Sequence, residues 1–519
     1  MQETSHNILN SNRIAKNTLF LYIRMLFSLL VSLYTSRVIL HTLGVVDYGI
    51  YNVVGGFVAL FGTLNTSLSA GMQRFYNYYI GQENTDGVIR TYRTGRIIHL
   101  AFIALVALVL EPLGIWYVNH ILVLPADRLL ATNILLQSTV VSLLVIILQI
   151  PYTSLVLAYE KMDFYALLSV FSVVLRLLLV ICLPYIPCDK LMAFAGMNLL
   201  LAVFEFAMYY IFCRRRMPLV FSSKPPVEKV LLHDLLSFSG WNVVGTFAYI
   251  LKYEGVNMFL NFFFGPIVNA ARGIAYQVQN AIQNFAGTIS TAFRPQIVNA
   301  YAAHDEPHVV KLFFAETKAL YILMLTMIMP LIFEMDCVLH LWLGDVVPER
   351  STVFTILVLA DVLVTVINQP CNHIVFATGN ITAYQVVSSV ISLLLLPVAW
   401  LGLRLGCDAT YVFVVLIGFS ILNQAACVYI ANRHISFGIW LYIKRIVARY
   451  LLCIAVNAGA LYTVTSLVGA SYWRLLLTCT VSVLLNALLA YTIVFNREER
   501  ARLLLLMRKA LPHTKQPLP

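Results

Sequence analysis

The sequence contains little charge, because only 11% of its 519 residues are Asp, Glu, Lys or Arg. A soluble protein of this size carries roughly twice that fraction. The sequence also lacks a CxxC pair, a Walker sequence and the HExxH and GxSxG patterns. These absences exclude the usual signatures of metal sites, nucleotide hydrolysis and hydrolase chemistry. We therefore expect no enzyme activity, no cofactor and no bound metal, and we interpret the nine scattered cysteines as small buried apolar residues.

What the sequence does contain is apolar residues, at 60% of the chain with a mean hydropathy of +0.82. They fall in runs of about twenty, which is long enough to cross about 30 Å of hydrocarbon as helices. The short alternating segments of a membrane barrel are not seen. The sequence predicts an all-α polytopic membrane protein with about fourteen transmembrane helices. The expected spans are about 14–40, 47–72, 96–119, 128–155, 163–184, 191–212, 235–262, 266–294, 311–335, 352–377, 382–403, 409–431, 443–468 and 473–495.

The positive charge has an uneven distribution along the chain. The net charge is +11, and most Lys and Arg fall in one alternate set of loops and at the two ends. The other set holds few cations, namely Arg128, Lys190, Arg350, Arg404 and Arg474. Cytoplasmic loops collect Lys and Arg, so this bias predicts that both termini are cytoplasmic. It also accounts for the net charge without a nucleic-acid partner.

The two halves of the chain resemble each other. Each has a long helix, a hairpin with glycine (Gly44, Gly265) and a polar second helix that ends at an arginine (Arg74, Arg294). Parallel repeats are typical of transporters that move two lobes around a central site, although a duplication without transport is the alternative. The predicted parts are an N-terminal lobe of six helices (1–213), a basic linker (214–234), a C-terminal lobe of six helices (235–432), two further helices (433–496) and a cytoplasmic tail (497–519).

Four of the predicted helices carry polar stripes at helical spacing. The stripes lie on the first, second, seventh and eighth spans and include Asn52, Asn257, Asn269, Arg272 and Asn280. Polar side chains inside a membrane face a neighbouring helix or water. A polar packing seam between helices is one interpretation. Because arginine is rare in such seams, we favour a hydrated cavity between two pseudo-symmetric lobes.

Ionisable residues inside the spans indicate what that cavity binds. Arg24, Lys252 and Arg272 lie within spans, and each charge there is costly, by about 3 kcal/mol or more. Arginine suits phosphate oxygens, so a cationic cavity predicts an anionic cargo. Glu316 lies near a span end, where its side chain could reach the interface, and His373 is interpreted as a packing or interfacial residue.

One hairpin carries the most specific pattern in the sequence, LG-x-x-DYG-x-Y. Its residues are Leu43, Gly44, Asp47, Tyr48, Gly49 and Tyr51. With the repeat and the helix count, this pattern resembles the bacterial polysaccharide and O-antigen flippases of the multidrug/oligosaccharidyl-lipid/polysaccharide exporter superfamily. The resemblance implies a multi-pass protein of the bacterial cytoplasmic (inner) membrane that works by alternating access. It implies that undecaprenyl-diphosphate-linked oligosaccharide moves from the cytoplasmic to the periplasmic leaflet for surface polysaccharide synthesis.

The resemblance also suggests roles for residues. Related lipid II flippases place arginines of the first and neighbouring helices on the cargo diphosphate, and Arg24 is the position to which the resemblance carries this role. We add Arg272 and Lys252 to the diphosphate site from the charge pattern. The predicted sugar contacts are Asn280, Gln283, Tyr249 and Tyr253, and the candidates for coupling to Na⁺ or H⁺ are Glu205, Glu254 and Asp361.

Other partners and functions follow from the same pattern. Membrane lipids and polysaccharide assembly proteins are the further partners that we consider. A multidrug exporter of organic cations would share the fold, but its cavity would favour acidic residues. A membrane polysaccharide polymerase or ligase handles the same lipid carrier, yet it would need a sizeable extracytoplasmic loop, and all of these loops are short.

Overall fold

The structure is a computed structural model that describes residues 2–159, 161–221, 229–378, 381–496 and 499–500. Within these helices, some side chains lie outside the description, among them those of 2–26 and 236–247. The chain divides into two compact units. The first unit comprises Met1–Gln277, Trp342–Ser351 and Ser392–Val412, and the second comprises Val278–Leu341, Thr352–Ile391 and Phe413–Pro519.

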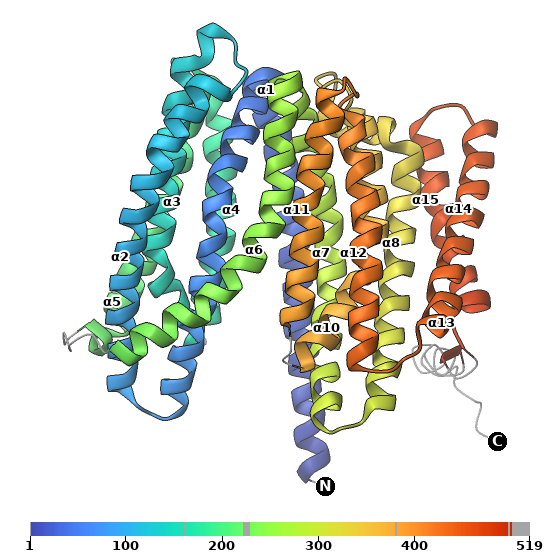
Figure 1. Cartoon of the computed structure of the whole chain (residues 1–519), viewed down its shortest axis with the longest axis horizontal. Helices are drawn as coiled ribbons and strands as arrows, with labels where there is room; N and C mark the ends of the chain where they lie inside the picture. The colour runs from blue at the N-terminus through green and yellow to red at the C-terminus, as the bar shows by residue number, and fades with distance from the viewer. Residues whose placement is uncertain (1, 160, 222–228, 379–380, 497–498, 501–519) are drawn as a thin grey trace, which may run out of the picture. The chain divides into compact units, whose positions relative to one another are not determined.

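The described residues form helices and no strand (Figure 1). The first seven α-helices are α1 (Gln2–Gly81), α2 (Thr85–Trp116), α3 (Leu129–Ala158), α4 (Met162–Cys182), α5 (Lys190–Arg216), α6 (Lys229–Phe264) and α7 (Pro266–Ala302). The later helices are α8 (Glu306–Leu343), α9 (Ser351–Thr365), α10 (Gln369–Thr378), α11 (Thr382–Arg404), α12 (Thr410–His434), α13 (Ile439–Tyr442), α14 (Ala448–Leu467) and α15 (Tyr472–Leu489).

The all-α membrane architecture predicted from the sequence is confirmed, and the expected spans fall on helical residues, although the span expected at 352–377 is divided between α9 and α10. Ten stretches of the described residues are long and apolar enough to cross a membrane. The polar helix α7 is not one of them, because amide and arginine side chains lower its hydropathy. The count of about fourteen spans therefore stays a prediction, as does the division into lobes at 1–213 and 235–432.

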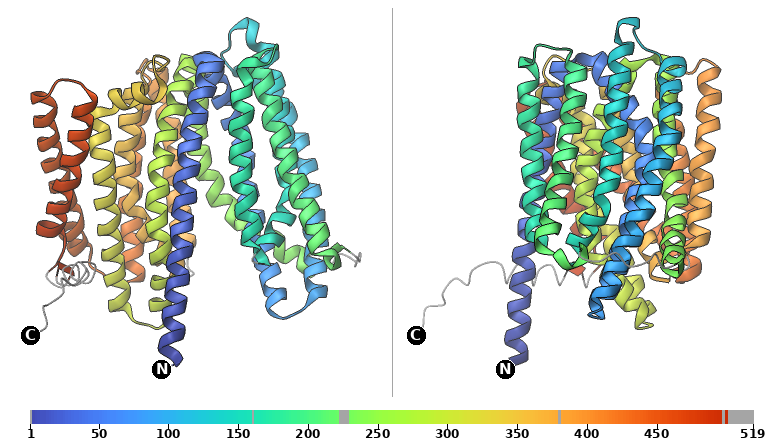
Figure 2. Two further views of the ribbon diagram at one scale, coloured as in Figure 1. Left: turned by 180° about the vertical axis from the view of Figure 1, so that it is seen from behind. Right: turned by 90° about the vertical axis from the view of Figure 1, so that its left-hand side faces the viewer.

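Two glycines make the turns that the first unit is built around. Gly44 interrupts α1 with a φ of 76°, and Gly265 joins α6 to α7 with a φ of 78°. Both angles lie in the left-handed region, which residues with a Cβ rarely adopt. The two turns are neighbours, because a Cβ added at Gly49 would overlap the carbonyl of Pro266. From its turn, α6 runs obliquely across the unit, as Figures 1 and 2 show.

The aspartate of the LG-x-x-DYG-x-Y pattern forms an ion-pair network beside the first of these turns. Arg128, at the start of α3, donates from Nε to Asp47 Oδ1 at 2.8 Å and pairs with Oδ2 through a second nitrogen. Its third nitrogen lies 2.7 Å from Asp189 Oδ2. Asp189 also caps α5, because its Oδ1 accepts from the backbone N–H groups of Leu191 and Met192. The network therefore ties three helices, α1, α3 and α5, at one end of the unit.

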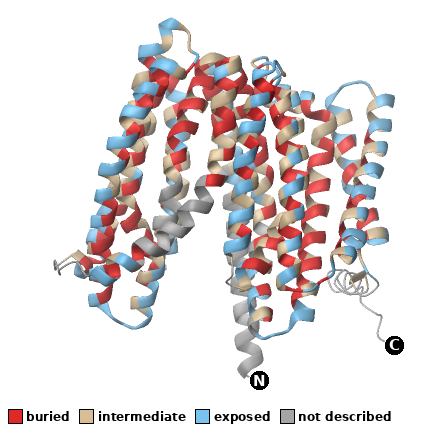
Figure 3. Cartoon of the chain, viewed as in Figure 1, coloured by how far each residue is buried: buried red, intermediate tan, exposed pale blue. Residues whose placement is uncertain are grey.

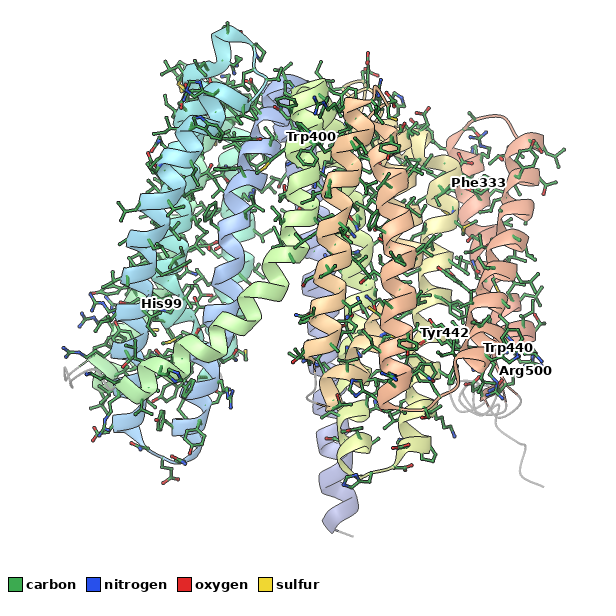
Figure 4. The ribbon with its side chains drawn as sticks, viewed as in Figure 1. His99, Phe333, Trp400, Trp440, Tyr442 and Arg500 are labelled. Atoms are coloured by element: carbon green, nitrogen blue, oxygen red, sulfur yellow. The ribbon has the colours of Figure 1, made fainter. Side chains whose placement is uncertain are left out.

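Apolar burial holds the helices of each unit together. Figure 3 shows buried residues on the faces that neighbouring helices share, and on α2 the exposed residues line the outward face. At one end of the first unit, Tyr92 and Tyr152 join their hydroxyl groups at 3.0 Å within a buried aromatic cluster. Near the α6–α7 turn, Trp400 of α11 packs against Phe259 at a centroid distance of 5.1 Å (Figure 4).

Polar contacts fix the last helical hairpin of the second unit. Arg474, at the start of α15, donates to both oxygens of Glu334 on α8, at 2.8 and 2.9 Å. Glu334 is buried, and α8 departs from helical geometry at this residue. Asn457 of α14 and Asn486 of α15 exchange two hydrogen bonds, of 2.9 and 3.1 Å, in the interior of the hairpin. All nine cysteines are free thiols, but the expectation that all are buried is wrong for Cys182 and Cys188, which are exposed, whereas Cys213, Cys371, Cys427 and Cys453 are buried.

Candidate anion site

Three asparagines, half-buried Asn52 and buried Asn257 and Asn269, join α1, α6 and α7 just inside their turns. Asn269 donates to the carbonyl of Asn257 at 2.8 Å and to its side-chain oxygen at 2.7 Å. Asn257 in turn donates to the carbonyl of Asn52 at 3.2 Å. Asn257 is 1% exposed and Asn269 is fully buried. Among the described side chains, this arrangement is a packing seam between the three helices at this end of the polar stripes.

The seam depends on a close approach of α1 and α6 at Gly56. A Cβ added there would overlap the carboxylate of Glu254 and the amide of Asn257. Glu254 is half-buried, and its Oε2 accepts from Asn257 Nδ2 at 3.0 Å. Small residues let helix backbones approach closely inside membranes, and here the approach lets an amide bridge the two helices.

Arg272 lies on the first turns of α7, next to this seam, and is only 5% exposed. One guanidinium nitrogen donates to the carbonyl of Tyr253 at 2.7 Å, and the group lies 4.1 Å from the ring centroid of Tyr276. Its Nε has no hydrogen-bond partner, and it forms no ion pair with a carboxylate among the described residues. A carbonyl and an aromatic face stabilise a cation without neutralising its charge. The positive charge of Arg272 is therefore retained within the protein.

A second buried cation lies on the neighbouring helix. Lys252 of α6 is 7% exposed, and its ammonium lies 5.0 Å from the ring centroid of Tyr253. The rings of Tyr253 and Tyr276 meet edge to face at 5.7 Å. Two cations and two tyrosines thus form one cluster on α6 and α7. The structure brings together three of the predicted site residues, namely Arg272, Lys252 and Tyr253.

The other predicted site residues lie elsewhere or outside the described part. Glu205 is half-buried on α5, Asp361 is buried on α9, Asn280 is exposed on α7 and Gln283 is half-buried on the same helix. The side chains of Arg24 on α1 and Tyr249 on α6 lie outside the described residues. Asn280, Gln283 and Asp361 belong to the second unit, whereas the cation cluster belongs to the first.

Arg24 and Arg272 lie at different depths of the first unit. Arg24 precedes the Gly44 turn by twenty residues, or about 30 Å of helix. Arg272 follows the Gly265 turn by seven residues, or about 10 Å. Because the two turns are neighbours, the two positions differ by about 20 Å along the helices.

One buried ionisable pair was not anticipated from the sequence. Glu316 is fully buried on α8, whereas its place near a span end favoured an interfacial side chain. His373 of α10, interpreted as a packing residue, places Nδ1 3.0 Å from a Glu316 oxygen. The two residues are 57 positions apart, and the helix that carries His373 begins at a break. No pattern in the sequence marks that contact.

Comparison with known proteins shows what fold this is. No protein-family model matches the chain, and no curated protein does. Among solved structures, the lipid II flippase MurJ in an inward closed conformation matches with a TM-score of 0.69 and 14% identity, over 91% of this chain and 98% of that one. An inward-facing multidrug resistance MATE transporter matches with a TM-score of 0.64 and 11% identity, over 80% and 98%.

A third match is another transporter. It is a MOP superfamily transporter from Pyrococcus furiosus, described as having reversed polarity of its binding pocket, with a TM-score of 0.55 and 13% identity over 81% of this chain and 95% of that one. The identities are low, so these matches define the fold alone. The chain is a multi-pass membrane protein with the fold of the MOP superfamily transporters.

Proposed function

We propose that this protein is a flippase for undecaprenyl-diphosphate-linked oligosaccharide. It would move the repeat unit from the cytoplasmic to the periplasmic leaflet of the bacterial inner membrane by alternating access. The fold, which is shared with a lipid II flippase and with MATE transporters, supports transport rather than chemistry. The observation that carries the choice of cargo is the buried arginine of α7.

A buried arginine is energetically costly inside a membrane protein, which favours a functional role for it. Arg272 is 5% exposed, is held by the Tyr253 carbonyl and the Tyr276 ring, and keeps an unused donor at Nε. A guanidinium binds phosphate oxygens through two parallel hydrogen bonds, which is the geometry that a diphosphate offers. Lys252, beside Tyr253, adds a second positive charge to the same cluster. The cluster is therefore suited to an anionic group.

The separation of Arg24 from Arg272 suggests how a diphosphate would travel. About 20 Å along the helices is far more than one diphosphate can bridge. We propose that Arg24 would contact the cargo nearer the cytoplasmic leaflet and that Arg272 and Lys252 would contact it later. Asn280, Gln283, Tyr249 and Tyr253 remain the proposed sugar contacts.

Export of organic cations is the second candidate function. The observation that favours it is the buried carboxyl group of Asp361, which is 1% exposed, together with half-buried Glu254. Carboxylates in an aromatic cavity suit cationic drugs. In the flippase proposal, Glu205, Glu254 and Asp361 are instead candidates for coupling transport to Na⁺ or H⁺.

The test is a leaflet-protection assay in proteoliposomes with a lipid-diphosphate-linked oligosaccharide. The wild type should expose the cargo across the bilayer, and Arg272→Gln should slow this by about tenfold or more, the loss of one strong charged contact. Arg350→Gln is the matched control. This variant removes an exposed arginine that pairs with Asp408 on a turn, so it should flip at the wild-type rate.

Two results would contradict the proposal. Arg272→Gln that flips as fast as wild type would remove Arg272 from the anion site. Wild-type vesicles that leave the lipid in place while exporting an organic cation would favour the drug exporter.

A further inference from the structure

A buried polar cluster in the second unit lies on α7, α8 and α10. Glu316 on α8 is fully buried. Its Oε1 lies 2.9 Å from the hydroxyl of Ser290 on α7, and His373 Nδ1 on α10 lies 3.0 Å from Oε1 and 3.1 Å from Oε2. The Ser290 hydroxyl also lies 2.5 Å from Oε1 of Gln369, the first residue of α10. Four polar side chains from three helices therefore converge around the buried carboxyl group of Glu316, with Gln369 and His373 half-buried.

The number of protons in this cluster is informative. The Ser290 hydroxyl has one proton, but both of its neighbours, on Glu316 and Gln369, are oxygen acceptors. If Glu316 carries a proton, it donates to Ser290, and Ser290 donates to Gln369, so each contact has one donor and one acceptor. If Glu316 is ionised, the Gln369 amide must turn so that its nitrogen donates to Ser290. The geometry accommodates both protonation states of Glu316 with a rotation of one amide.

The cationic side chains near Glu316 make their contacts with other groups, so a proton is the cation that can balance its charge. Within the part of the chain that the structure describes, the titratable groups that face Glu316 are His373 and Cys371, both from α10. Lys318, two residues along α8, is held by both oxygens of Glu499. On α7, Arg294 lies over the ring of Phe376, 5.8 Å from its centroid.

Burial of a net negative charge is strongly unfavourable inside a membrane protein. Glu316 with neutral His373 has a net charge of −1. One proton, on either residue, makes the pair neutral. Proton binding therefore favours the closed arrangement that the structure shows, and exposure of the pair to water favours proton release.

A helix break lies next to the pair. Between α9 and α10 the chain forms a short 3₁₀ turn, Val366–Asn368, and Pro370 follows directly. Proline has no backbone N–H, so the break leaves carbonyls without helical donors. Two side chains from other helices supply donors: Tyr450 donates to the carbonyl of Leu363 at 2.8 Å, and Gln424 donates to that of Ile367 at 3.2 Å. Thus α10 is a short element that the break separates from α9; it buries Ile374 and Val375 and makes its polar contacts with Glu316 on α8 and Ser290 on α7.

We propose that Glu316 and His373 form a proton-binding site, and that loading and unloading of one proton there accompanies movement of α10 during transport. Discontinuous helices carry the coupling-ion sites of many transporters, and this pair has that placement. The inference rests on the proposed transport function, whose driving ion it identifies as H⁺. It adds Glu316 and His373 to the candidates Glu205, Glu254 and Asp361, which came from the sequence.

The first test is direct and needs no cargo. Infrared difference spectra of the purified full-length protein in lipid nanodiscs would be recorded across a pH titration. We expect a protonated carboxylic acid band that disappears as the pH rises, and the loss of this band in Glu316→Gln. In His373→Gln the band should persist but titrate at a different pH, since the imidazole no longer contacts the carboxyl group. Glu334→Gln is the matched control, because Arg474 donates to both oxygens of that buried carboxyl group and the band should be unchanged.

The second test measures transport. Flipping by the wild type in proteoliposomes should respond to an imposed pH gradient, and Glu316→Gln should abolish that response. A band that is unaffected by Glu316→Gln would overturn the proton site. A titrating band in vesicles that do not move the lipid would uphold the proton site and refute the proposed cargo. Flipping that is independent of the pH gradient in both proteins would refute proton coupling and leave the flippase in place.

Discussion

Replacing Asp47 by asparagine would remove one charge from the ion-pair network that ties α1, α3 and α5 together. Asp47 is 7% exposed and accepts from two nitrogens of Arg128. Asparagine offers a single acceptor, so the variant loses one charged hydrogen bond and the ion pair. A hydrogen bond to a charged group contributes about 1.5–3 kcal/mol, and breaking a fully buried ion pair costs about 3–5 kcal/mol. Arg128 is partly exposed and keeps Asp189, so we expect a loss of about 2–3 kcal/mol.

Asp189→Asn is the matched control for that variant. Asp189 accepts one hydrogen bond from Arg128, at 2.7 Å, and asparagine caps a helix as well as aspartate does. The control should lose only about 1 kcal/mol. In a double-mutant cycle, adding Asp47→Asn to Arg128→Gln should cost little more than Arg128→Gln alone, because the contact is already gone.

The assay is equilibrium unfolding in mixed micelles, followed by tryptophan fluorescence, with flipping measured on the same preparations. Equal losses in the Asp47 and Asp189 variants would refute the reasoning from geometry. A variant that is fully stable but inactive would show that Asp47 acts on the cargo rather than on the turn.

Two further perturbations test ion pairs at other places. Arg474→Gln leaves Glu334 buried without its cation and should destabilise the protein by about 3 kcal/mol in the same unfolding assay. The double variant with Glu334→Gln should recover most of this loss. An Arg474→Gln variant as stable as wild type would contradict the prediction. Partial burial of Asp408 opposes a lower pKa, but hydrogen bonds from Arg350 and Thr410 outweigh it and lower the pKa of Asp408 to about 2. The stabilisation that Asp408 contributes is therefore present above the ordinary value of 3.8 and is lost as the pH falls towards 2. The stability difference between wild type and Asp408→Asn should shrink over that interval, and a difference that stays constant would argue against the ion pair.

The sequence predicts the helices well because their signal is local. Runs of apolar residues and the glycines at positions 44 and 265 depend only on neighbouring residues, and the predicted spans fall on helical residues, with only the break at Val366–Asn368 unexpected. The cluster of Arg272, Lys252 and Tyr253 could also be anticipated. These residues lie on two helices joined by one tight turn, which keeps the two helices close to each other.

Contacts between distant helices could not be predicted in the same way. The asparagine stripe has the same spacing whether it lines water or packs against a neighbour, and only the close approach at Gly56 makes it a packing seam. The pair of Glu316 and His373 depends on the rotation of α8 and on the break before α10. Neither the rotation nor the break has a periodic signal in the sequence.

The carboxamide pair in the last hairpin has a consequence for biosynthesis. When α14 leaves the ribosome and enters the membrane, Asn457 has no counterpart until α15 has also been made. A lone carboxamide facing hydrocarbon is unfavourable, and so the two helices are more stable when they enter the bilayer together. The exchange of hydrogen bonds between Asn457 and Asn486 then marks the completion of the hairpin. A chain that stops before α15 would present an unpaired polar helix to the proteases that remove incomplete membrane proteins.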